Sequence, residues 1–307
     1  MTAKSERIKG MFLVLMASMS WGTTGILQAF APDGAHPLTV GAIRVVLASF
    51  LLMIYLKWRG ESIIAILRRP PILHLVITVI GVMGYQFSFF PALLLTGVSV
   101  GSMIAIGAAP VIAGIMGAVF EKEPLSGRWF LSTSIAIIGC ALLLGFGSST
   151  DITVNIKGAS LAFLAALCYA TLGLGMKRLG TCLNHVEAAA AATTASLVVG
   201  LPVLILFNPM WIFTGRGLVI ASALGILTEA LPMCYFAVGL KKIYLRDAFT
   251  LSLFEPLTAF GLSALILGER LAPLPLFGAA LILCGIFILS SDPRNREQES
   301  RPEPVSQ

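Results

Sequence analysis

Apolar residues form ten long runs along the chain, and most polar residues lie between the runs. A helix that crosses a membrane needs roughly 20 consecutive, mostly apolar residues. Each run is close to this length, and turn formers such as Pro32-Asp33-Gly34 and Asn208-Pro209 stand in the short connections. The pattern predicts membrane-spanning helices over the ranges 10–30, 37–57, 72–94, 97–119, 128–146, 157–178, 186–207, 217–239, 247–267 and 273–290.

The composition agrees with a chain that faces lipid. Of its 307 residues, 57% are hydrophobic and 12% are charged, and the mean hydropathy is +0.92. So few charges cannot cover a soluble globule of this size. We therefore expect an all-α polytopic protein of the inner membrane, with the lipid bilayer as its main solvent.

The positions of Lys and Arg test the span count independently, because cytoplasmic loops hold most of these residues. With the N-terminus inside, the segments predicted to be outside hold only Lys157, Arg216 and Arg270 of the 21 basic residues. Both termini are therefore expected to be cytoplasmic. Nucleic acid is not an expected partner, because the basic residues form no continuous stripe.

The two halves of the chain share sequence features. A shift of 148 residues aligns Trp21 with Tyr169, and a shift of 146 residues aligns Pro110 with Pro256. Each half holds five spans, an odd number, so the second half would enter the membrane upside down. Chance similarity among Leu- and Ala-rich helices is the alternative. We predict two inverted five-helix repeats around a central cavity, with these boundaries: 1–9 cytoplasmic N-terminus, 10–146 first repeat, 147–156 external linker, 157–290 second repeat and 291–307 disordered cytoplasmic tail.

Several motifs resemble the EamA domain of the drug/metabolite transporter superfamily. They lie in the stretch 92–144, in Phe254-Glu255-Pro256-Leu257 with the following Leu-Gly-Glu-Arg-Leu, in Trp21-Gly22 and in Arg44. The resemblance covers both halves. It implies a ten-helix bundle around a central cavity that moves amino acids, other metabolites or drugs, often outward. The chain departs from the family at Glu121-Lys122-Glu123-Pro124, where Gly-Glu-Arg-Leu is usual.

Charged groups inside spans are costly and are functional candidates. At 1.5 Å per residue, Arg44 lies about 10 Å from the outer face, Glu229 roughly 18 Å below it, and Glu255 roughly 12 Å above the inner face. Our hypothesis is that Glu229 and Glu255 face the cavity on neighbouring helices and carry a proton that couples transport to the proton gradient. The alternative is structural: Glu255 accepts hydrogen bonds or pairs with Arg44 to lock the halves together.

Aromatic residues near mid-span are candidates for substrate binding. Trp21 and Tyr169 lie about 16 Å deep from opposite faces. Tyr85, Phe89 and Phe90, with Tyr235 and Phe236 of the matching span, add aromatic surface for an apolar or aromatic side chain, while Arg44 is a candidate to hold a carboxylate. Ordinary helix packing is the alternative for each aromatic residue.

Prolines within spans suggest hinges. Pro110 and Pro256 occupy matching positions in the two halves, which favours a shared mechanical role over incidental kinks. Glu123, Glu269, Asp247 and His74 lie near span ends, where polar side chains commonly cap helices or make loop contacts.

An enzyme is not expected. Residues 97–101 match the pattern GxSxG, but a nucleophile elbow needs a strand-to-helix turn, whereas this stretch opens a membrane helix. Neither a metal nor a cofactor is expected, because His, Cys and carboxylates show no ligand spacing. The predicted function is a secondary active transporter that exports small metabolites, with amino acids favoured. A membrane channel or facilitator and a multidrug exporter are the alternatives, and a homodimer is left open.

Overall fold

The computed structural model describes residues 3–32, 34–145, 155–267 and 272–291, and these residues contain helices and turns but no strand. The predicted external linker and cytoplasmic tail lie almost wholly outside this part of the chain. The helices are α1 (Ala3–Gly22), α2 (Thr24–Ala29), α3 (Pro37–Trp58), α4 (Ile63–Arg68), α5 (Ile72–Thr96), α6 (Val98–Phe120), α7 (Gly127–Gly145), α8 (Ile156–Leu179), α9 (His185–Leu206), η1 (Met210–Phe213), α10 (Gly215–Gly225), η2 (Ile226–Ala230), α11 (Leu231–Leu240), α12 (Leu245–Ser252), α13 (Phe254–Leu267) and α14 (Pro273–Ser290).

Ten segments of the described residues are long and apolar enough to cross a membrane, which confirms the predicted number of spans. Most spans are single helices. The first combines α1 with α2, the eighth combines α10, η2 and α11, and the ninth combines α12 with α13. Helix α1 begins at Ala3, before the predicted start at residue 10, so the basic N-terminal residues continue the helix beyond its apolar part. Which face is cytoplasmic stays a prediction from the charge pattern.

Local signals in the sequence explain several helix starts. Asn184 accepts hydrogen bonds from the backbone of Val186 and Glu187, and the Glu187 side chain accepts one from the Asn184 backbone, which completes a capping box for α9. His36 caps α3, and Pro37 occupies its first position, where a missing N–H costs nothing. These contacts satisfy backbone groups that the helices leave free.

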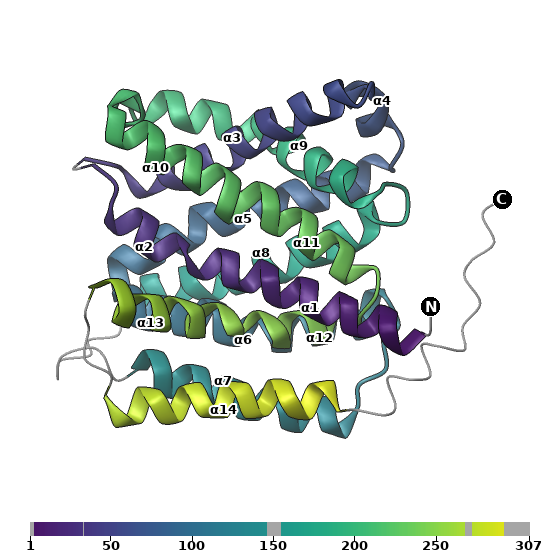
Figure 1. Cartoon of the computed structure of the whole chain (residues 1–307), viewed down its shortest axis with the longest axis vertical. Coiled ribbons are helices and arrows are strands. Elements are labelled where there is room, and N and C mark those ends of the chain that lie inside the picture. The colour runs from purple at the N-terminus through teal and green to yellow at the C-terminus, as the bar shows by residue number, and fades with distance from the viewer. Residues whose placement is uncertain (1–2, 33, 146–154, 268–271, 292–307) are drawn as a thin grey trace.

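The spans pack in pairs that follow the order of the two halves. The contacts join α1 to α11, α5 to α8, α3 to α9, α6 to α12, and α7 to α14. When every span is replaced by the corresponding span of the other half, the same set of pairs is obtained. Two related halves are expected to give this result. Figure 1 shows the α7–α14 pair side by side at the lower edge, with the other helices stacked above it.

Glycines allow the closest of these pairs to form. A Cβ added to Gly81 of α5 would lie 2.3 Å from the Leu172 nitrogen of α8, and one added to Gly175 would lie 2.4 Å from Thr78 Oγ1. On α7, a Cβ at Gly139 would lie 2.6 Å from the Gly278 carbonyl oxygen of α14. Backbones that approach so closely gain van der Waals contact, the main driving force between helices in lipid.

Candidate functional site

A cavity of about 420 Å³ lies among the spans and is lined by residues of both halves. Its lining reaches from mid-span positions such as Trp21 and Tyr169 to Gln28, Leu94 and Val98 at the helix ends. All of these helix ends belong to the face that the charge pattern predicts to be external. The volume falls in the range of roughly 300–1,000 Å³ that is typical of small-molecule sites.

Aromatic residues form a continuous wall of this cavity. The rings of Tyr85 and Phe89 stack with centroids 5.0 Å apart, because a spacing of four residues places them on one face of α5. Tyr169 lies 5.3 Å from Tyr85, and Trp21 lies 5.9 Å from Tyr169 in an edge-to-face arrangement. The wall therefore joins α5, α8 and α1, and it offers ring faces to an apolar group or to a cation.

Tyr235 and Phe236 are the exceptions among the predicted aromatic residues, because neither is part of the cavity lining. Tyr235 packs against the hydrophobic core. Its neighbour Phe236 is fully buried and lies 5.2 Å from the Trp21 ring. Adjacent residues of a helix point about 100° apart, so of the two predicted side chains it is Phe236 whose ring meets the aromatic wall.

Arg44 pairs with Glu229 inside the bundle. Arg44 Nη2 lies 3.3 Å from Glu229 Oε2 and donates a hydrogen bond of 2.7 Å to the Thr228 carbonyl oxygen. The residue four positions later, which would donate to this carbonyl in a regular α-helix, is Pro232, and proline has no N–H. Arg44 therefore contacts both a buried carboxylate and a backbone carbonyl. The Arg44–Glu255 ion pair of the structural alternative is not formed among the described residues, although the two groups lie within electrostatic range.

Both cavity carboxylates lie where a span departs from regular α-helix. Glu229 lies in the π-helical turn η2, a feature that occurs frequently at functional sites. Glu255 lies in the first turn of α13, directly after a break at Leu253. Pro256 explains that break, because its ring would clash with the carbonyl of Ser252, the last residue of α12.

Glu255 also contributes a charged group to the cavity. Its side chain is partly exposed to the cavity and makes no hydrogen bond or ion pair with other residues in the described part of the chain. Gly22 of α1 packs directly against the backbone of Glu255, because a Cβ added at Gly22 would lie 2.7 Å from the Glu255 carbonyl oxygen. The contact brings the start of α13 directly against the turn that carries Trp21.

The two predicted hinge prolines differ in their surroundings. Pro256 lines the cavity beside the break in the ninth span. Pro110 lies within α6, which continues without interruption from Val98 to Phe120. A hinge role for both prolines stays a prediction, and only Pro256 adjoins a helix break.

Polar cavity residues that the sequence analysis missed come from three different spans, and they include Gln28, Gln86 and Ser102. Uncharged polar residues are common in apolar helices, so no sequence signal separated these three from residues that face lipid. No group of three His, Cys, Asp or Glu residues that could hold a metal ion occurs within the described ranges.

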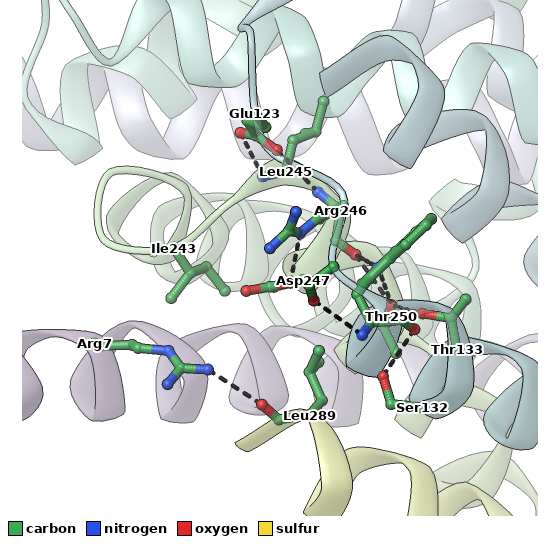
Figure 2. A network of polar contacts seen from close by, with 12 residues as sticks. Arg7, Glu123, Ser132, Thr133, Ile243, Leu245, Arg246, Asp247, Thr250 and Leu289 are labelled. Atoms are coloured by element: carbon green, nitrogen blue, oxygen red, sulfur yellow. Dashed lines mark hydrogen bonds and ion pairs between the residues drawn. The ribbon is translucent and has the colours of Figure 1, made fainter. Parts of the chain in front are cut away.

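Below the cavity, the opposite ends of the spans are packed around α12, all of whose residues are buried. Glu123 accepts hydrogen bonds from the backbone nitrogens of Leu245, at 2.9 Å, and Arg246, at 3.4 Å, at the start of this helix (Figure 2). It also pairs with Lys177 of α8. The prediction that Glu123 caps a helix is thus confirmed, and the capped helix is α12.

Other contacts hold α12 against α7. Trp129 Nε1 donates to Thr250 Oγ1 at 3.2 Å, and the hydroxyls of Thr250 and Thr133 lie 2.8 Å apart. Arg246 and Asp247 are buried, and their side chains pair at 3.2 Å. Figure 2 shows this network, together with the hydrogen bond from Arg7 of α1 to the Leu289 carbonyl oxygen of α14. The part of the bundle below the cavity is therefore closed by polar contacts among its helices.

The described part of the chain thus has ten candidate membrane spans and, among them, a cavity lined by aromatic and charged residues, which defines a multi-pass membrane protein of the transporter class. The chain belongs to the EamA-like transporter family, whose model matches residues 8–145 and again 156–291. Two copies of the family domain cover nearly the whole chain.

Several relatives carry transporter names. The chain is 33% identical to "Uncharacterized transporter YwfM" of Bacillus subtilis (strain 168), covering 92% of this chain and 94% of that protein. It is 27% identical to "Threonine/homoserine exporter RhtA" of Escherichia coli (strain K12), covering 88% and 87%. It is 26% identical to "S-adenosylmethionine/S-adenosylhomocysteine transporter" of Chlamydia trachomatis serovar D, covering 91% and 88%. These names point to transport of small molecules rather than to catalysis.

A crystal structure of another protein supports the fold. It matches this chain with a TM-score of 0.79 at 20% identity, and the match covers 95% of this chain and 99% of the other. At this level of identity, the likeness concerns the fold alone.

Proposed function

We propose that the chain is a secondary active transporter that exports a small metabolite, most specifically an amino acid with an apolar or aromatic side chain, by alternating access. The observation that carries the proposal is a cavity whose lining reaches one face of the bundle while buried contacts close the other face. An alternating-access carrier in one of its end states has this arrangement. The name of the relative RhtA, an exporter of threonine and homoserine, supports the outward direction.

The cavity lining supports an amphiphilic substrate. The wall of Trp21, Tyr85, Phe89 and Tyr169 suits an apolar or aromatic side chain, and charged groups lie within the same cavity. Small-molecule sites commonly combine a mostly apolar lining with a few placed polar groups. A free amino acid presents both kinds of surface.

The closed face supports a conformational cycle rather than an open pore. For the cavity to open toward the other face, α12 would have to break its contacts with Glu123 and Trp129. The break at Leu253 separates α12 from α13, so the two halves of this span can move independently. A substrate could then meet the cavity from each side in turn.

Proton coupling through Glu229 and Glu255 is the second part of the proposal. The contacts favour Glu255 as the proton carrier, because Glu229 is already paired with Arg44 at 3.3 Å. An acid without a partner among the described residues can exchange its proton without first breaking an ion pair. Glu229 would then hold Arg44 in place.

Counterflow in proteoliposomes tests the transporter proposal. Vesicles containing the purified protein are loaded with one unlabelled amino acid or amine, and uptake of the labelled counterpart is followed. Transient accumulation of an amino acid is the expected result. Equilibration without accumulation would indicate a channel or facilitator, and accumulation of hydrophobic drugs alone would indicate a multidrug exporter.

The coupling proposal is tested in the same vesicles with an imposed pH gradient. We expect Glu255→Gln to remove the response of transport to the gradient, while the protein remains monodisperse on size exclusion. Glu229→Gln should act mainly through stability. An unchanged pH response in both variants would refute proton coupling through these carboxylates.

A further inference from the structure

We propose that Glu255 is the counter-ion for a positively charged amino group of the substrate, and that the cavity requires this group more strongly than it requires a carboxylate. The inference rests on the proposed transport function and specifies what its substrates must share.

The charges of the cavity lining do not cancel. Arg44, Glu229 and Glu255 are the charged residues of the lining within the described part of the chain. Arg44 and Glu229 neutralise each other across 3.3 Å. Arg44 lies within electrostatic range of Glu255 but forms its ion pair with Glu229. With Glu255 ionised, the cavity therefore has one negative charge in excess, and such a charge is costly at this depth in a membrane protein until a partner arrives.

Arg44 is poorly placed to receive a substrate carboxylate. It is 5% exposed, and its Nη2 serves both Glu229 and the Thr228 carbonyl oxygen. Its Nε is buried and has no acceptor among the described residues, so a bidentate contact through Nη2 and Nε would require the existing pair to separate. Moving Arg44 from this position would also break its hydrogen bond to the Thr228 carbonyl oxygen.

Glu255, in contrast, is available to a ligand. Its side chain is less buried than that of Glu229, and it forms no hydrogen bond or ion pair with the described residues, although Arg44 lies within electrostatic range. Its position in the first turn of α13 favours a negative charge, because the helix dipole is positive at that end. A substrate cation is the simplest partner that would complete the site.

The aromatic wall adds a second reason for a cation. Tyr85 and Tyr169 lie within electrostatic range of Glu255, and their ring centroids are 5.3 Å apart. Trp21 is on the turn that packs against the start of α13 through Gly22. Ring faces attract ammonium groups, most strongly where water is excluded. A carboxylate at the same place would instead meet the negative faces of the rings and the charge of Glu255.

Competition in the counterflow assay tests the inference. The probes are labelled L-phenylalanine, L-leucine and L-threonine. Each probe competes first with its own amide, which keeps the amine but lacks the carboxylate. It then competes with its N-acetyl derivative, which keeps the carboxylate but lacks the charged amine. We expect the amide to compete at least tenfold more strongly than the N-acetyl compound. The inference is overturned if the N-acetyl compound competes as well as the amide.

Two variants assign the effect to Glu255. In Glu255→Gln, the preference for the amide should fall at least tenfold, and Glu255→Asp, which keeps the charge, should retain most of it. Glu121→Gln, at a pair outside the cavity, is the matched control and should keep the full preference. If Glu255→Gln folds and keeps the wild-type preference, Glu255 is not the counter-ion. If none of the three amino acids is exchanged by the wild type, the proposed amino-acid transport fails instead, and the inference fails with it.

Discussion

The guanidinium of Arg44 and the carboxylate of Glu229 lie 3.3 Å apart and join α3 to the π-helical turn η2. Their side chains are 6% and 3% exposed. Each member of such a buried pair is stabilised by the other, because either group alone would be an uncompensated charge in a medium of low dielectric constant.

This dependence predicts a specific pattern of stability. Arg44→Met and Glu229→Gln should each lower the free energy of unfolding by roughly 3–5 kcal/mol, the usual cost of removing one partner of a buried pair. The double variant should be less destabilised than the sum of the two. Thermal unfolding of the purified protein in detergent measures the three variants, and additive effects would contradict the coupling.

The close approach of α5 and α8 predicts an unequal response to glycine replacement. Gly81→Ala would place a Cβ 2.3 Å from the Leu172 nitrogen, a backbone atom that cannot move cheaply. We expect a loss of roughly 1–3 kcal/mol or more, as is typical of overpacking. Gly107→Ala is the matched control, because no atom lies within 4 Å of its added Cβ. Equal melting temperatures for the two variants would show that the helices do not meet at Gly81.

The cap at the start of α12 predicts a local change in dynamics. Glu123→Gln weakens the contacts with Lys177 and with the α12 backbone, so amide hydrogen exchange of residues 245–252 should become faster. The expected local cost is roughly 1–3 kcal/mol, the range for a buried group that loses a charged partner.

Glu121→Gln provides the control for that experiment. Glu121 is on the same loop and pairs with Arg178 at 3.0 Å, but both side chains are partly exposed, at 22% and 23%. Partly exposed pairs contribute about 0–1 kcal/mol, so exchange in α12 should not change. Faster exchange in both variants would mean that the loop as a whole, and not the cap, holds α12.

Two tyrosines distinguish the cavity wall from ordinary packing. Tyr85→Leu removes an aromatic ring from the cavity lining, and transport at limiting substrate should fall roughly 2- to 12-fold, the equivalent of an aromatic contact of about 0.5–1.5 kcal/mol. Tyr235→Leu changes a residue outside the lining and should leave transport near the wild-type level. Counterflow of the identified substrate measures both. The opposite order of effects would place the substrate elsewhere.

The architecture at the level of spans follows from the amino-acid sequence alone. Lipid offers no hydrogen bonds to the backbone, so each apolar run must satisfy its own groups as a helix. Run length therefore predicted the ten spans, and the ends of most helices agreed with the runs to within about two residues. The same physics singled out Arg44, Glu229 and Glu255, because a charge within an apolar run is conspicuous whatever the fold.

Which faces of these helices meet depends on the packing of the whole bundle. Most of the spans are apolar on all sides, so periodicity does not reveal their rotation. Hence the sequence could not choose between Tyr235 and Phe236 as the residue beside Trp21, and its structural alternative paired Arg44 with Glu255 and not with Glu229. Such pairs join side chains that are far apart in the chain, and no local run of residues carries the information that brings them together.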